Sequence, residues 1–263
     1  MKNNLIREKV DQRLPMTSTR IWSTNPFIVE TVGCSQQFDY VEFAAEYAPF
    51  SQVDLENMCR AAELYGMGSM IKLDLQNRGY VAQKAMAAGF QAVLFADHST
   101  PEQIEESIRL TMPTTPECGG YYGYPMRRFI GGQSHLTPMN HAKRVKEVVR
   151  CFMIEKKTAL DHIDEICCIP GVDMVQFGSG DWSMNQGFDR NDRPKECREA
   201  ERKMIEAALK HGVRPRCEVK SAEDAKYYHD LGVIDIALDD EIYALRRFWF
   251  EEGARFRKIV KGE

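Results

Sequence analysis

Short runs of apolar and β-branched residues alternate with amphipathic segments along most of the chain. Runs of the first kind predict buried strands, and the amphipathic segments predict helices that cover them. The expected strands lie near residues 19–23, 40–44, 69–73, 92–96, 151–154, 174–177, 214–219 and 234–238. Eight alternations of strand and helix favour a closed parallel (β/α)₈ barrel, a TIM barrel, over an open doubly wound sheet.

The expected helices carry start and stop signals. Their segments are LENMCRAAELYG, YVAQKAMAAG, TPEQIEESIRLTM, TALDHIDEIC, ECREAERKMIEAALKHG and SAEDAKYYHDLG. Ser99 and Thr100 precede Pro101 as capping residues, and glycines follow four of the helices, at Gly66, Gly89, Gly212 and Gly232. These residues are typical of helices that begin at a polar cap and end at a glycine.

No boundary or repeat divides the chain, so we expect a single domain over residues 1–263. The long interruption at about 113–138 is rich in glycine and predicts an ordered loop over one mouth of the barrel. The final segment, at about 240–260, reads EIYALRRFWFEEGARFRKIV and predicts a helix with an aromatic-rich face. Such a face packs either on its own barrel or at a subunit interface.

Composition narrows the class of protein. A chain of 263 residues with 43% apolar content can bury one large core. The net charge of −4 comes from interspersed residues, which gives no footprint for nucleic acid or an anionic membrane. No stretch approaches the roughly 18 apolar residues of a membrane span. We therefore expect a cytoplasmic protein that acts on small molecules.

The eight cysteines are scattered without CxxC spacing, which favours reduced thiols over a disulfide framework. Cys167 and Cys168 are adjacent. We interpret them as ordinary buried thiols at a helix end, with a redox pair as the alternative.

Polar residues follow the carboxyl ends of the expected strands, where barrel enzymes place their active sites. They are Glu46 and Tyr47 after the second strand, Lys72 and Asp74 at the third, Asp97 and His98 after the fourth, Glu155 after the fifth and Asp181 after the sixth. The sequence therefore predicts a polar ring around one mouth.

Four segments carry a more specific resemblance: FDYVEFAAEYAP, MIKLDLQN, CFMIEKKTALDHIDEICCIPGVDMVQFGSGDWS and LGVIDIALDDEIYALRR. From about Ser18 to Phe256 the chain resembles the HpcH/HpaI aldolases, metal-dependent class II enzymes of the 2,4-dihydroxyhept-2-ene-1,7-dioate and 2-dehydro-3-deoxyglucarate aldolase type. The resemblance implies a TIM barrel of the phosphoenolpyruvate/pyruvate-domain type. It also implies a homo-oligomer, commonly a hexamer in which the terminal helix packs on a neighbour.

The resemblance implies that Glu155 and Asp181 are the metal ligands. A hard cation such as Mg²⁺ or Mn²⁺, with Co²⁺ as a further candidate, prefers oxygen ligands, and two carboxylates leave positions for water and a chelating 2-oxo acid. The backbone around Ser179 and Gly180 is expected to donate hydrogen bonds to the substrate carboxylate. The competing interpretation is that both acids are solvated loop residues.

The chain departs from the family where protons are moved. The family motif DGEHAP reads AAEYAP here, so Ala44 replaces an aspartate and Tyr47 replaces the acid/base histidine. Ala87 and Ala88 occupy the stretch of the aspartate that pairs with that histidine. A tyrosine has a reference pKa of about 10, against about 6.5 for histidine, so Tyr47 is a candidate proton donor but a poor base.

Two further departures concern the substrate. Lys72 stands in place of an arginine, and Met153 in place of a glutamine two residues before the metal glutamate. Lys72 keeps the charge that would stabilise an oxyanion, whereas a Schiff-base role for it is the alternative. Glu46 remains beside Tyr47 as a substrate-binding candidate. His98 is a candidate proton carrier facing the mouth, and a capping or solvent-exposed histidine is the competing interpretation.

The predicted function is that of a carbon–carbon lyase. A metal-bound enolate of a pyruvate-like 2-oxo acid would form as the bond next to the keto group is cleaved or made, with an aldehyde as the second partner. Two alternatives stay open. One is a decarboxylase or other enolate-forming enzyme on the same platform, favoured by the missing histidine–aspartate pair. The other is a non-catalytic or degenerate binding barrel.

Overall fold

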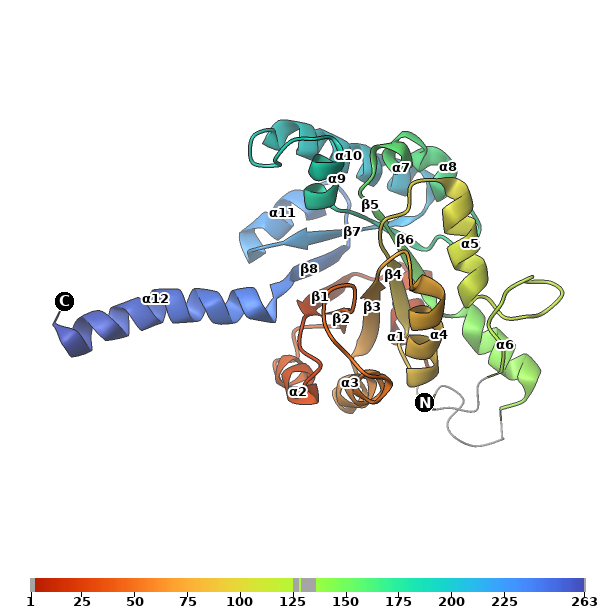
Figure 1. Ribbon diagram of the computed structural model, residues 1–263, viewed down its shortest axis with the longest axis horizontal. Coiled ribbons are helices and arrows are strands. Elements are labelled where there is room, and N and C mark those ends of the chain that lie inside the picture. The colour runs from red at the N-terminus through yellow and green to blue at the C-terminus, as the bar shows by residue number, and fades with distance from the viewer. Residues whose placement is uncertain (1–2, 125–127, 129–135, 263) are drawn as a thin grey trace.

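The computed structural model describes residues 3–124, 128 and 136–262 and contains a closed barrel of parallel strands (Figure 1). Each strand pairs with the next along the chain, and the last pairs with the first. The strands are β1 Met16–Ile21, β2 Tyr40–Ala44, β3 Gly68–Leu73, β4 Ala92–Phe95, β5 Val149–Ile154, β6 Met174–Phe177, β7 Arg214–Val219 and β8 Asp235–Asp240. The predicted (β/α)₈ fold is confirmed.

Helices surround this barrel. They are α1 Leu5–Asp11, α2 Pro26–Cys34, α3 Gln52–Leu64, α4 Arg78–Ala88, α5 Pro101–Thr111, α6 Pro138–Lys146, α7 Lys157–Asp161, α8 Ile163–Cys167, α9 Ser179–Asn185, α10 Pro194–His211, α11 Ala222–Asp230 and α12 Glu241–Lys261. The first strand begins three residues earlier than expected. Helices α1, α2 and α6 were not predicted from the sequence.

Two apolar clusters hold the barrel together. The larger one lies between the strands and the surrounding helices, and the smaller one fills the barrel beside α1. Ile6 of α1 belongs to the inner cluster, and the backbone N–H of Leu5 donates to the Gln91 side chain at 3.0 Å. Helix α1 therefore closes the end of the barrel at which the strands begin.

A buried polar network lies inside the barrel. The Arg216 guanidinium forms an ion pair with Glu42 at 2.7 Å and donates to the Tyr40 hydroxyl at 2.7 Å and to Ser18 Oγ at 3.1 Å. Tyr40 in turn donates to Asp235 at 2.8 Å. These contacts join β1, β2, β7 and β8. They supply the compensating partners that a fully buried charge requires.

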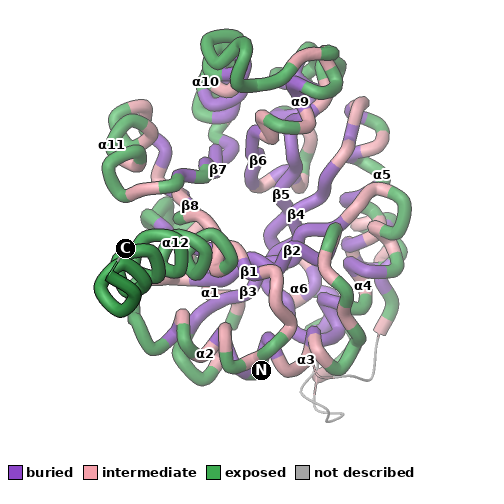
Figure 2. Tube along the Cα trace, turned by 60° about the vertical axis from the view of Figure 1, so that its left-hand side comes forward, coloured by how far each residue is buried: buried purple, intermediate pink, exposed green. Residues whose placement is uncertain are grey.

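Helix α12 leaves the barrel as a long projection, with the C-terminus at its tip (Figure 1). It contains no buried residue, and the tube in Figure 2 shows it exposed along its length, whereas strands such as β4, β5 and β6 are buried. Residues 125–127 and 129–135 of the predicted 113–138 loop lie outside the described residues. Among the residues that are described, no helix is long and apolar enough to cross a bilayer.

Candidate active site

A cavity of about 490 Å³ opens at the carboxyl ends of the strands. Six of the predicted site residues line it: Tyr47, Lys72, Met153, Ser179, Gly180 and Asp181. Strand ends bring these residues together from distant parts of the chain, as expected for a barrel of this kind.

Glu155 follows β5 and is buried beside this cavity. The backbone N–H of Asp97 donates to its Oε1 at 2.7 Å, from a residue held in the left-handed region at φ 63°. Within the described part of the chain, its Oε2 has no hydrogen-bond partner. Gly178 lies against that oxygen, because a Cβ there would stand 2.4 Å from Oε2. The lack of a side chain at Gly178 therefore leaves room for the Glu155 carboxylate itself.

The electrostatics of Glu155 connect it to the rest of the site. Burial raises the pKa of Glu155 to about 7, the nearby Lys72 ammonium opposes this rise, and the carboxylates of Asp181 and Asp97 add to it. Asp97 is itself paired with Lys156 at 2.6 Å. A buried carboxylate whose pKa is raised further by neighbouring carboxylates is one whose charge a bound cation would stabilise.

Asp181 lies in the first turn of α9 and is half-buried at the cavity wall. Its charge acts on both Glu155 and Tyr47. Within the described residues there is no group of three or more His, Cys, Asp or Glu side chains arranged for a metal. A cation held by this pair alone would keep coordination positions for water or substrate, which is a catalytic rather than a structural arrangement.

Lys72 projects into the cavity from the end of β3. Its ammonium lies 2.6 Å from a Glu46 carboxylate oxygen and 5.3 Å from the centre of the Tyr47 ring. Tyr47 also stacks on Trp22, with ring centres 5.7 Å apart. Its pKa is raised by burial and then by Glu46, so the hydroxyl keeps its proton at neutral pH. Tyr47 can therefore donate a proton from this position but is a poor acceptor.

The structure does not bring His98 into the cavity. Its ring is buried, with Nδ1 2.8 Å from the Ala96 carbonyl oxygen and Nε2 2.6 Å from Ser107 Oγ in α5. Burial lowers the pKa of His98 to about 4. The left-handed turn at Asp97 precedes His98, whose ring packs against Phe95 and Phe152. His98 thus neither faces the mouth nor caps a helix; it ties β4 to α5.

Several residues that line the cavity were not predicted from the sequence. Arg20, near the end of β1, pairs with Glu42 at 3.2 Å and with Glu218. Arg190, in the segment after α9, reaches Ser179 Oγ at 3.4 Å and lines the same cavity. An arginine near the end of a predicted strand was an available signal for Arg20. Nothing local in the sequence distinguishes Arg190 from a solvated loop arginine.

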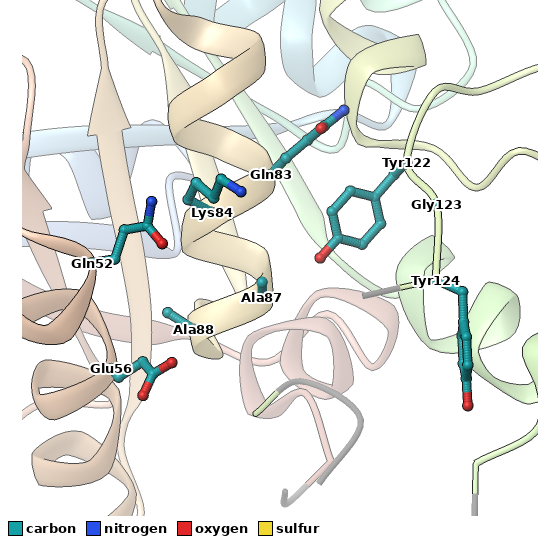
Figure 3. Close-up of a pocket in the computed structure, with 9 residues that line it drawn as sticks. All are labelled: Gln52, Glu56, Gln83, Lys84, Ala87, Ala88, Tyr122, Gly123 and Tyr124. Atoms are coloured by element: carbon teal, nitrogen blue, oxygen red, sulfur yellow. The ribbon is translucent and has the colours of Figure 1, made fainter. Parts of the chain in front are cut away.

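A second cavity, of about 520 Å³, lies outside the barrel between α3, α4 and the segment after α5 (Figure 3). Figure 3 shows the Tyr122 hydroxyl directed toward α4, whose Gln83 and Lys84 side chains line the opposite wall. Among the described residues around it, none is a predicted site residue. The cavity at the strand ends is therefore the candidate active site.

Comparisons with known proteins agree with the fold and identify a family. The family model described as HpcH/HpaI aldolase/citrate lyase matches residues 21–227. A hydroxypyruvate/pyruvate aldolase from Delftia acidovorans is 24% identical over 247 residues, covering 90% of this chain and 87% of that protein. A 2-keto-3-deoxy-L-rhamnonate aldolase from Escherichia coli is 25% identical, covering 72% and 70%.

Solved structures agree on the fold. A crystal structure of an HpcH/HpaI aldolase/citrate lyase family protein from Burkholderia cenocepacia superposes with a TM-score of 0.86 at 20% identity, covering 97% of this chain and all of that one. Together these matches confirm the predicted family and the predicted enzyme class, a carbon–carbon lyase.

Proposed function

Because the chain belongs to the HpcH/HpaI aldolase/citrate lyase family, we propose that it is a metal-dependent aldolase acting on a pyruvate-like 2-oxo acid. The bond cleaved or formed lies next to the keto group, and an aldehyde is the second partner. The observation that carries the proposal is the buried Oε2 of Glu155, which packs against Gly178 and has no hydrogen-bond partner among the described residues.

Glu155 and Asp181 would hold the cation, and their oxygen donors fit Mg²⁺ or Mn²⁺, with Co²⁺ as a further candidate. When bound, the cation would supply electrophilic polarisation of the keto group. Ser179 and Gly180 line the same cavity, and their backbone N–H groups would bind the substrate carboxylate. Met153 forms part of the buried floor beneath them.

Lys72 would stabilise negative charge that develops on the substrate oxygen. Its ammonium lies in the cavity and is oriented by the 2.6 Å contact with Glu46. A fixed cation aimed at developing charge is among the larger single contributions to catalysis. Tyr47 would deliver a proton to the aldehyde-derived oxygen, since its hydroxyl stays protonated beside Glu46.

The alternative within the same class is a decarboxylase or another enolate-forming enzyme. The observation that favours it is that neither predicted acid/base residue is placed to act as a base: the Tyr47 phenol is a poor proton acceptor, and His98 is bonded elsewhere. Decarboxylation generates the carbanion equivalent without removing a proton from carbon, so it needs no such base. A non-catalytic binding barrel is the third possibility.

Exchange of the methyl protons of pyruvate in deuterated water tests the proposal. We expect exchange in the presence of Mg²⁺ or Mn²⁺. The loss of the methyl proton signal in NMR spectra measures it. Glu155→Ala should abolish the exchange, while Glu206→Ala on the exposed face of α10 should not change it.

Absence of exchange with Mg²⁺, Mn²⁺ and Co²⁺ would contradict the aldolase proposal for pyruvate, and if oxaloacetate is not decarboxylated either, a binding protein is favoured. Carbon–carbon bond formation when an aldehyde is added would separate the aldolase from a decarboxylase. Decarboxylation of oxaloacetate without such bond formation would support the alternative.

We also propose that the chain is a single barrel domain that assembles as a homohexamer, with α12 at a subunit interface. Exposed apolar residues lie along α12: Phe248, Trp249, Phe250, Phe256, Ile259 and Val260. A largely apolar cavity of about 550 Å³ lies between α2 and the start of α12. An exposed apolar helix beside an apolar groove is suited to exchange between copies.

The free cysteines suit a reducing compartment, the cytoplasm.

A further inference from the structure

We propose that Cys168 is a reactive thiol that forms mixed disulfides with low-molecular-weight disulfides, assisted by His211 and Asp164. This site is separate from the cavity that holds Glu155. Cys168 immediately follows α8 and His211 ends α10, and both helices lead into strands, so the group lies at the opposite end of the barrel.

The three side chains form a hydrogen-bonded series. His211 Nε2 lies 2.7 Å from Asp164 Oδ1, and His211 Nδ1 lies 3.4 Å from Cys168 Sγ. In neutral imidazole only one nitrogen carries a proton. Since a carboxylate accepts, the proton belongs on Nε2, which leaves Nδ1 to accept from the thiol. A nucleophile, a base and a group that orients the base are thus in contact.

Lys210 adds positive charge to the same group. Its ammonium lies 2.7 Å from Asp164 Oδ1, and its charge also interacts with Cys168. A cation at this place also attracts an anionic disulfide from solution toward the sulfur. Cys168 is exposed, so a disulfide in solution can reach it.

The other cysteines provide the contrast. Cys167 is buried, and burial raises its pKa to about 12, so it remains an unreactive thiol. The expectation that both adjacent cysteines are buried is therefore wrong for Cys168. Cys34 is exposed like Cys168, but its Sγ faces the Tyr65 hydroxyl at 3.3 Å, and a phenol is a poor base. Cys34 is a matched control within the same molecule.

The chemical step is thiol–disulfide exchange. His211 Nδ1 takes the proton of Cys168, and the thiolate attacks one sulfur of the small disulfide. The disulfide bond breaks as the new sulfur–sulfur bond forms, and the second sulfur leaves as a thiolate that accepts the proton from the imidazole. Cys168 is oxidised, the incoming disulfide is reduced, and no further reagent is needed.

Oxidised glutathione is the probe for the test. The full-length protein is incubated with it at neutral pH, and the modification of each cysteine is followed by peptide mass spectrometry. We expect Cys168 to react about tenfold faster than Cys34. His211→Gln should slow Cys168 to the rate of Cys34 while leaving Cys34 itself unchanged, which shows that the variant is folded.

Two results would overturn the proposal: equal rates for Cys168 and Cys34 in the native protein, or an unchanged Cys168 rate in His211→Gln. Cys168→Ser should remove the fast modification and leave pyruvate exchange unaffected. The reactive thiol and the proposed aldolase function can therefore fail independently.

Discussion

At the scale of single residues, Glu155 is a carboxylate in an energetically unfavourable environment. It is buried, one carboxylate oxygen has no partner, and burial raises its pKa to about 7. An unpaired buried charge costs folding free energy, and proteins retain such costs mainly where function requires them. We infer that Glu155 is kept for a ligand and not for stability.

Replacing Glu155 by glutamine should therefore stabilise the metal-free protein in a pH-dependent way. The folded pKa lies above the unfolded value, so ionisation destabilises the fold progressively as pH rises toward about 7, and the effect is complete above that. The free energy of unfolding of Glu155→Gln relative to wild type should increase by about 2 kcal/mol between about pH 5 and about pH 8. Thermal or urea unfolding in EDTA measures it. An increment that is the same at both pH values would show that the carboxylate is not perturbed.

At the scale of elements, the junction between β6 and α9 shapes the site. Gly178 has a negative φ of −106°, so an alanine there is tolerated by the backbone. Its Cβ, however, would stand 2.4 Å from Glu155 Oε2 and 2.9 Å from the Met153 methyl carbon. Gly178→Ala should displace the carboxylate and weaken Mn²⁺ binding at least about tenfold, as measured by calorimetry.

Gly180→Ala is the matched control, because the nearest atom to its Cβ would be an Arg190 nitrogen at 3.9 Å. Equal Mn²⁺ affinity in both variants would argue against Glu155 as a ligand. Loss of affinity in Gly178→Ala alone would link the glycine to the carboxylate beside it.

The strands were predictable from sequence because barrel strands are short and buried on both faces, and seven of the eight expected segments closely match the observed ones. Helix α6 was missed although Thr137 and Pro138 form a cap and first-turn pair. The ring of site residues followed from strand ends. The orientation of His98 did not, because the left-handed backbone at Asp97 breaks the alternation of side chains, and no sequence pattern marks that turn.

At the scale of the whole molecule, α12 is the feature that a lone barrel does not explain. A helix with aromatic residues on its surface and none buried is a poor end state for a single copy in water. We expect light scattering to give the mass of a hexamer. Phe250→Glu should shift the protein toward smaller species, and Glu251→Gln, on the same helix, should not.

A monomeric wild-type protein at micromolar concentration would contradict this assembly. Unchanged helix content in the circular dichroism spectrum of Phe250→Glu would show that the charge acts on association and not on folding of the helix.

The network around Arg216 also constrains how the chain is made. Glu42 and Tyr40 leave the ribosome long before the guanidinium that compensates them, and Asp235 follows later still. Of the ion-pair partners of Glu42, only Arg20 has been made by then, and the remaining contacts are made with water. We expect the interior of the incomplete barrel to stay hydrated during synthesis. Water should leave it when the last strand, β8, joins the sheet. Chains truncated before β8 should therefore have little of the final stability.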